Sequence, residues 1–173
     1  EPLVDYRHAP IEFAEVASMT MELFGDDSLD EFYSAADASR AKRKHLEGII
    51  EILPWIARVD AFQHWIYTNP SHTRDERTAA WLRLGERFEA PIEWAGHDDQ
   101  RNAGWQRQLH IFCYPFYYIE YGIAQLGALQ IWDTFKRDAT RGLSDYRAAL
   151  ALGGSRPLPE LFEAAGAQLA FDE

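Results

Sequence analysis

The stretch that most strongly indicates the fold is residues 115–135, which read PFYYIEYGIAQLGALQIWDTF. Large apolar side chains recur in it every three or four residues, at Phe116, Ile119, Ile123, Leu126 and Leu129. This is the spacing of side chains on one face of an α-helix. Pro115 suits the first helical position, where no backbone N–H is needed. We therefore predict a strongly apolar helix from Pro115 to Phe135 or beyond.

Helical periodicity also runs through the amino-terminal half of the chain. An apolar set with three- and four-residue spacing predicts a helix over residues 11–25. A longer pattern predicts a helix over residues 28–68, which Pro54 is expected to kink or divide. The hydroxyl group of Thr73 suits the cap of a further helix, over residues 73–89.

The remaining segments are less regular. Residues 90–108 lack a sustained period, and we expect a loop with at most a short helical turn. Residues 142–144, Gly-Leu-Ser, are expected to end the long helix, and shorter helices are expected over residues 144–152 and 159–170. No alternating strand pattern of useful length occurs. The sequence predicts an all-α fold, a helical bundle forming a single domain over residues 1–173.

Composition narrows the possible partners. The formal net charge of -11 would repel a phosphate backbone, which argues against nucleic acid as a partner. Charged residues interrupt every apolar run before it reaches the roughly 20 residues of a membrane span.

Cys113 is the only cysteine, which excludes an internal disulfide and a thiolate-rich metal site. A reducing cytoplasm is the location we expect.

One carboxylate occupies an unusual position in the first predicted helix. Glu15 lies amid the apolar face of the segment His8-Ala9-Pro10-Ile11-Glu12-Phe13-Ala14-Glu15-Val16-Ala17-Ser18-Met19. An unpaired charge is costly to bury, so this carboxylate needs a partner. A salt bridge or a helix-capping interaction is one interpretation. A zinc ligand is the other, because a carboxylate oxygen is a normal member of a tetrahedral His/His/Glu set.

A second segment combines a histidine with several tyrosines. Residues 110–122 read HIFCYPFYYIEYG. On the predicted helix, Tyr118 and Tyr121 are three residues apart and Tyr117 and Tyr121 four apart, so at least two hydroxyl groups can share a face, with His110 and Tyr114 at its entrance. Phenol and imidazole donors that converge on one point can stabilise a tetrahedral oxyanion. Packing of the rings in a core is the alternative.

Taken together, the two segments resemble the oligoendopeptidase F branch of the thimet-oligopeptidase-like zinc metallopeptidases. Residues 10–19, Pro-Ile-Glu-Phe-Ala-Glu-Val-Ala-Ser-Met, resemble the family's third-ligand helix, and residues 110–125 resemble its carboxy-terminal His/Tyr motif. The resemblance covers most of the chain in order and spacing. It implies that the bundle is the carboxy-terminal part of a larger, mostly helical metallopeptidase.

The resemblance implies a role for each candidate residue. In that family a downstream histidine and tyrosines bind substrate and stabilise the developing oxyanion, which here implies His110, Tyr118 and Tyr121. Tyr117 is the alternative to Tyr118. Tyr114 is expected to face the substrate.

The implied zinc site is incomplete in this chain. In the family, zinc is held by two histidines of a His-Glu-x-x-His motif and by a glutamate on a following helix, which here corresponds to Glu15. The glutamate of the motif activates the zinc-bound water. None of the six histidines is followed by glutamate, so the motif does not occur in these 173 residues. We expect a fragment of a longer enzyme that hydrolyses short peptides, inactive and only weakly zinc-binding by itself.

The partners expected from this interpretation are an oligopeptide substrate and the missing amino-terminal part of the same enzyme. Self-association is plausible if the apolar surface that meets that part is exposed. The competing hypothesis is a non-catalytic helical module that binds a peptide or a protein through its tyrosine-rich segment.

Overall fold

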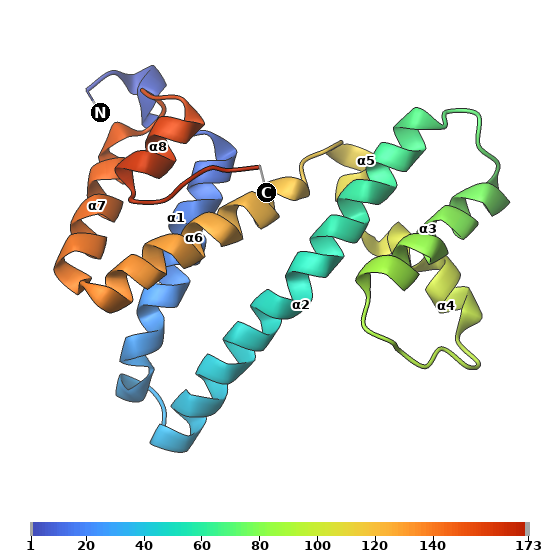
Figure 1. The fold of residues 1–173 in the computed structure, drawn as a ribbon, viewed down its shortest axis with the longest axis horizontal. Helices are drawn as coiled ribbons and strands as arrows, with labels where there is room; N and C mark the ends of the chain where they lie inside the picture. Colours follow the sequence, from blue (N-terminus) through green and yellow to red (C-terminus); the bar gives the residue numbers. More distant parts are fainter. Residues whose placement is uncertain (1, 172–173) are drawn as a thin grey trace. The chain divides into compact units, whose positions relative to one another are not determined.

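The computed structural model describes residues 2–171, and over this range the chain is all-α, as predicted. Its α-helices are α1 (Ile11–Gly25), α2 (Ala35–Thr68), α3 (Arg74–Phe88), α4 (Asp98–Ala103), α5 (His110–Cys113), α6 (Ile119–Arg137), α7 (Ala139–Leu152) and α8 (Leu158–Ala164), shown in Figure 1. Short 3-10 helices cover Val4–Arg7, Asp26–Glu31 and Gly104–Arg107. Within residues 2–171, no helix has both the length and the apolar character needed to cross a membrane.

The chain divides into two compact units. The first unit combines Glu1–His45 with Ile123–Glu173, and the second unit is Leu46–Gly122. Helices α2 and α6 each contribute residues to both units. The expectation of a single folding domain over residues 1–173 stays a prediction.

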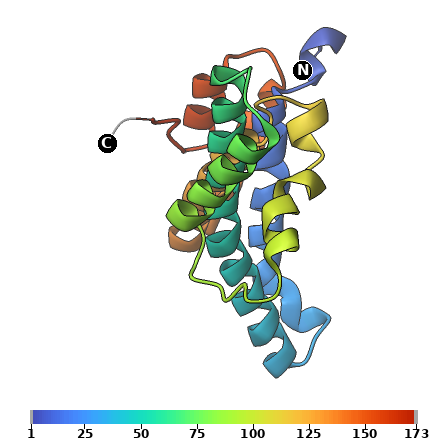
Figure 2. The ribbon, with the colours of Figure 1, turned by 90° about the vertical axis from the view of Figure 1, so that its right-hand side faces the viewer.

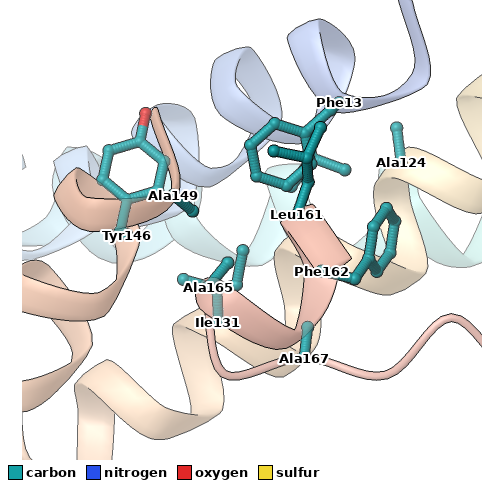
Figure 3. Close-up of a cluster of buried hydrophobic side chains, with 10 residues drawn as sticks. Phe13, Ala124, Ile131, Tyr146, Ala149, Leu161, Phe162, Ala165 and Ala167 are labelled. Carbon is teal, nitrogen blue, oxygen red and sulfur yellow. The ribbon is translucent and has the colours of Figure 1, made fainter. Parts of the chain in front are cut away.

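The core of the first unit is formed by α1, α6, α7 and α8 (Figure 3). Its buried residues are Phe13, Val16, Ala124, Ile131, Tyr146, Ala149, Leu161, Phe162, Ala165 and Ala167. The rings of Phe13 and Phe162 lie 5.9 Å apart between centroids, and the Tyr146 hydroxyl donates to the Ala17 carbonyl oxygen at 2.9 Å. Burying each large apolar side chain contributes about 1.5–3 kcal/mol, so this core fixes the four helices together.

Helices α2 and α3 lie side by side in the second unit (Figure 2). Aromatic side chains form the core between them. Phe62 of α2 makes an edge contact with Trp81 of α3, at 5.2 Å between ring centroids, and Trp105 lies 5.7 Å from Phe62. Thr73 caps α3 as predicted: its side chain accepts a hydrogen bond from the Glu76 backbone, and the Glu76 carboxylate accepts one from the Thr73 backbone. This reciprocal pair satisfies two backbone donors at the start of α3.

The predicted helix from Pro115 was wrong at its amino-terminal end, because α6 begins only at Ile119. Phe116 has φ of 60°, in the left-handed region that a right-handed α-helix cannot include. Tyr117 and Tyr118 therefore precede α6, and they do not share a helix face with Tyr121 as the sequence pattern predicted.

Other helix boundaries also differ from the prediction. Helix α2 begins at Ala35, and the hydroxyl group of the preceding residue, Ser34, accepts a hydrogen bond from the Asp37 backbone N–H. Pro54 lies inside α2 and does not divide it. The expected loop over residues 90–108 does contain helical turns, in α4 and in the 3-10 helix Gly104–Arg107. Helix α8 is shorter than predicted and ends before Gly166, whose φ is 76°.

The predicted break at residues 142–144 was wrong in its position. Helix α6 ends at Arg137, and α7 starts at Ala139, where the Asp138 carboxylate accepts a hydrogen bond from the Arg141 backbone. Gly142 lies inside α7, and its role is close approach: a Cβ atom there would lie 2.6 Å from the Phe135 Cα atom. The glycine thus permits α6 and α7 to pack tightly.

Replacing Gly142 with alanine should destabilise the first unit. The added methyl group would meet backbone, which cannot rotate away, so we expect the free energy of unfolding to fall by about 1–3 kcal/mol in urea titration. Gly25→Ala is the matched control, because Gly25 has a helical φ of -65° and a Cβ atom added there would meet no heavy atom within 4 Å. Equal stability of the two variants would contradict the close-packing role of Gly142.

Candidate functional site

The site is centred on His110, the first residue of α5, in the second unit. Ile111 anchors this short helix in the aromatic core, and the Phe112 ring stacks on Trp105 at 5.5 Å. The backbone then turns sharply. The backbone N–H of Tyr117 donates to the Tyr114 carbonyl oxygen, and the backbone N–H of Glu120 donates to the Tyr117 carbonyl oxygen. The turn brings the tyrosines that follow α5 back toward the histidine.

Four tyrosine rings surround the His110 imidazole. The distances between ring centroids are 6.1 Å to Tyr114, 5.6 Å to Tyr117, 5.1 Å to Tyr118 and 5.8 Å to Tyr121. The Tyr121 hydroxyl also lies 3.4 Å from His110 Nε2. The structure thus brings together the five residues that the sequence placed in one His/Tyr group.

The imidazole of His110 is oriented by Gln108. The Gln108 side-chain nitrogen lies 2.6 Å from His110 Nδ1. With the amide nitrogen as donor, Nδ1 is the acceptor, and the neutral ring carries its proton on Nε2. That proton is on the side of the ring that faces the Tyr121 hydroxyl, so His110 can act as a hydrogen-bond donor there.

Tyr118 is the most deeply buried of the tyrosines in this group, with 8% of its surface exposed. Its hydroxyl oxygen accepts a hydrogen bond from the Trp55 indole nitrogen at 3.1 Å. Burial raises the pKa of Tyr118 above its ordinary value, while the hydrogen bond from Trp55 acts in the opposite direction. The hydroxyl group is therefore protonated at neutral pH and able to donate.

Tyr114 and Tyr117 differ in exposure. Tyr114 is 56% exposed at the end of α5, where a bound molecule could reach it. Tyr117 is half-buried, and its ring stacks on His110 with an interplanar angle of 21°. Both Tyr117 and Tyr118 contact the His110 ring. Ring contact with His110 therefore does not decide which of the two tyrosines is the better candidate for the oxyanion donor.

The turn between α5 and α6 is held at Phe116, the residue with positive φ. A bulky residue in this conformation costs about 1–2 kcal/mol, and such strain is concentrated at functional sites. The Phe116 ring packs against His64 and Tyr67 of α2, at 4.9 and 5.1 Å between centroids. These contacts offset the backbone strain and fix the tyrosines that follow.

Glu15, the candidate zinc ligand, lies on α1 in the first unit and is half-buried. The Ser18 hydroxyl, one turn further along, lies 3.0 Å from the Glu15 carbonyl oxygen and 3.3 Å from a Glu15 carboxylate oxygen, and it shares its proton between the two. Orientation of a ligating carboxylate by such a hydrogen bond is common at metal sites. Across residues 2–171, however, no three histidine, cysteine or acidic side chains gather to hold a metal ion.

Sequence reasoning missed Gln108 and Trp55. Gln108 had a local signal, because a polar amide two residues before a candidate histidine can reach its ring. Trp55 had none: it lies 63 residues from Tyr118 in the chain, and only the packing of α2 brings the two together.

The fold agrees with that of known proteins. The model of peptidase family M3 matches residues 1–173, and the chain belongs to this family. The resemblance to the oligoendopeptidase F branch is confirmed by solved structures. No match was found among curated proteins.

Three solved structures are similar to this chain. A candidate oligoendopeptidase F is 37% identical, with a TM-score of 0.88, and the match covers 96% of this chain and 29% of that one. PZ peptidase A, solved with an inhibitor, is 34% identical, with a TM-score of 0.88 and coverage of 95% and 29%. A candidate oligoendopeptidase F from Bacillus anthracis strain Ames is 28% identical, with a TM-score of 0.76 and coverage of 95% and 26%. The chain thus spans less than a third of the length of each.

The contacts of two histidines predict opposite tautomers. His110 should carry its proton on Nε2, because its Nδ1 accepts from the Gln108 amide. His72 should carry its proton on Nδ1. The Nε2 atom of His72 accepts a hydrogen bond from Arg77, and its Nδ1 atom faces the Asn69 carbonyl oxygen. Nitrogen-15 chemical shifts of the two rings at neutral pH distinguish the tautomers directly. Gln108→Leu should remove the Nε2–H preference of His110 and leave His72 unchanged. An Nδ1–H tautomer at His110 in the unsubstituted chain would contradict the assigned contact.

Proposed function

We propose that this chain is the carboxy-terminal part of a zinc-dependent oligoendopeptidase that hydrolyses short peptides. Membership of peptidase family M3 supports the reaction class. The observation that carries the proposal is the clustering of four tyrosines around His110. This cluster offers several neutral hydrogen-bond donors in one place, which is what a tetrahedral oxyanion requires.

Glu15 would supply one zinc ligand, with Ser18 orienting its carboxylate. One carboxylate is a fitting member of a His/His/Glu set but is not a site by itself. The two histidines and the general base would come from a His-Glu-x-x-His motif elsewhere in the enzyme. When bound, zinc lowers the pKa of a coordinated water and polarises the scissile carbonyl group.

The donors of this chain would stabilise the charge that develops on the carbonyl oxygen. The neutral Tyr118 hydroxyl, the Tyr121 hydroxyl and the Nε2–H of His110 are the groups proposed for this task. Because they are fixed by packing before substrate binds, they need not reorganise during the reaction. Tyr114, the most exposed ring of the group, is proposed to contact the bound peptide.

Phenylalanine substitutions test the oxyanion donors. In a longer chain that carries the His-Glu-x-x-His motif, Tyr118→Phe and Tyr121→Phe should each lower turnover by about 10²- to 10³-fold. Zinc content should stay near that of the unsubstituted enzyme, because neither tyrosine is a proposed ligand. The measurements are kcat on a short fluorogenic peptide and zinc by atomic emission. Near-normal turnover in both variants would remove these tyrosines from the mechanism.

The 173-residue chain alone should behave differently. With one proposed ligand, it should show no peptidase activity and should lose zinc to a mild chelator. Atomic emission after dialysis against the chelator is the measurement. One zinc ion retained per chain would refute the assignment of the remaining ligands to another segment.

A second function is favoured by the apolar surface near the site. Leu109, Phe112 and Tyr114 are more than half exposed and follow one another closely in the chain. A peptide, a protein or a second copy of the chain could cover them, as expected for a non-catalytic binding module.

The gene distinguishes the two functions: an in-frame upstream His-Glu-x-x-His supports the enzyme, and a start codon close to Glu1 supports the module. A cytoplasmic location, proposed from the single thiol Cys113, suits either function.

A further inference from the structure

A tryptophan outside the His/Tyr segment contacts the hydroxyl group of its most buried tyrosine. The Trp55 indole nitrogen lies 3.1 Å from the Tyr118 hydroxyl oxygen. An indole N–H can donate but cannot accept. The Tyr118 oxygen must therefore be the acceptor, and its own proton has to point away from Trp55.

The position of Trp55 is itself fixed by aromatic packing. Its ring meets Trp81 edge-on, at 5.6 Å between centroids and an interplanar angle of 88°. The Arg107 guanidinium group also lies on Trp55, 4.7 Å from the ring centroid. Trp55 is half-buried and packs against the core of the second unit, and these contacts restrict the direction of its N–H.

Trp81, the neighbour of Trp55, is anchored on two further sides. The buried Arg58 guanidinium group lies 3.4 Å from a Trp81 ring centroid and is ion-paired with Glu89. The Trp81 indole nitrogen donates to the Arg101 carbonyl oxygen at 3.1 Å. Through Trp81, the orientation of Trp55 thus depends on the packed core of this unit.

We propose that Trp55 is a positioning residue for Tyr118: its indole N–H occupies the Tyr118 oxygen and leaves the Tyr118 proton for the carbonyl oxygen of a bound peptide. The proposal rests on the function proposed above. A donor to the phenol oxygen also polarises the O–H bond, which strengthens that group as a donor. Trp55 touches neither substrate nor metal in this account and acts only through Tyr118.

The hydrogen bond can be tested in the 173-residue chain without any activity. Carbon-13 labelling of tyrosine Cζ atoms gives the titration of each phenol by NMR, and Tyr118→Phe identifies the Tyr118 signal. Trp55→Phe keeps an aromatic ring and removes the donor. Because that donor favours the ionised phenolate, its loss should raise the pKa of Tyr118 further.

Trp65→Phe is the matched control for this titration. Trp65 belongs to the same aromatic cluster, where its ring packs on Phe62 and His72, whereas the hydrogen bond to the Tyr118 hydroxyl comes from Trp55. The pKa of Tyr118 should not change in this variant. An unchanged or lower pKa in Trp55→Phe, or an equal rise in Trp65→Phe, would overturn the proposal.

A reciprocal measurement covers the case in which Trp55→Phe fails to fold. Tyr118→Phe removes the acceptor, so the Trp55 indole proton should shift upfield and exchange faster with solvent. Tyr121→Phe removes a neighbouring hydroxyl that is not the acceptor of the Trp55 N–H, and it should leave that signal in place. If the Trp55 indole proton signal is unchanged in Tyr118→Phe, Trp55 does not donate a hydrogen bond to the Tyr118 hydroxyl.

Kinetics of the longer, active chain distinguish positioning from mere packing. Trp55→Phe removes the hydrogen bond to the Tyr118 hydroxyl, which should lower kcat by about 3- to 10-fold with KM little changed. In a Tyr118→Phe background, Trp55→Phe should cause no further loss, because its target is gone. A fully additive loss would overturn the positioning role. If Tyr118→Phe leaves kcat unchanged while the pKa shift is seen, the function proposed for Tyr118 fails and the hydrogen bond is structural only.

Discussion

The left-handed backbone at Phe116 is the constraint on which the arrangement of the site depends. A regular helix from Pro115 would have placed Tyr117 and Tyr118 on the same helix as Tyr121. The interruption instead turns Tyr117 and Tyr118 back onto His110 before α6 begins at Ile119. The conformation costs about 1–2 kcal/mol for a bulky residue, and the contacts of the Phe116 ring with His64 and Tyr67 compensate for it.

Helix α2 supports this turn at two separate points. Near its carboxy-terminal end, His64 and Tyr67 hold Phe116, and nearer its middle, Trp55 reaches the Tyr118 hydroxyl. The site of the second unit is therefore a short, strained segment held against a long helix. Preorganised donors of this kind suit the stabilisation of a transient oxyanion, because they do not have to move when the charge develops.

The sequence predicted the all-α class, the span of α1 and the cap of α3 because these follow from local rules of periodicity and hydrogen bonding. It also predicted the grouping of His110 with its tyrosines, since those residues are close in the chain. It could not predict the positive φ of Phe116, because phenylalanine gives no local signal for that conformation. The contact of Trp55 with Tyr118 depends on packing across 63 residues, which no local pattern records.

The central proposal is that Glu15 would complete a zinc site whose other ligands lie outside these 173 residues. The most direct measurement joins the chain to a segment that carries a His-Glu-x-x-His motif and compares zinc content and peptide hydrolysis before and after Glu15→Gln. The account predicts one zinc ion and hydrolysis in the joined protein, and the loss of both in the variant. Tightly bound zinc together with undiminished hydrolysis in Glu15→Gln would contradict it.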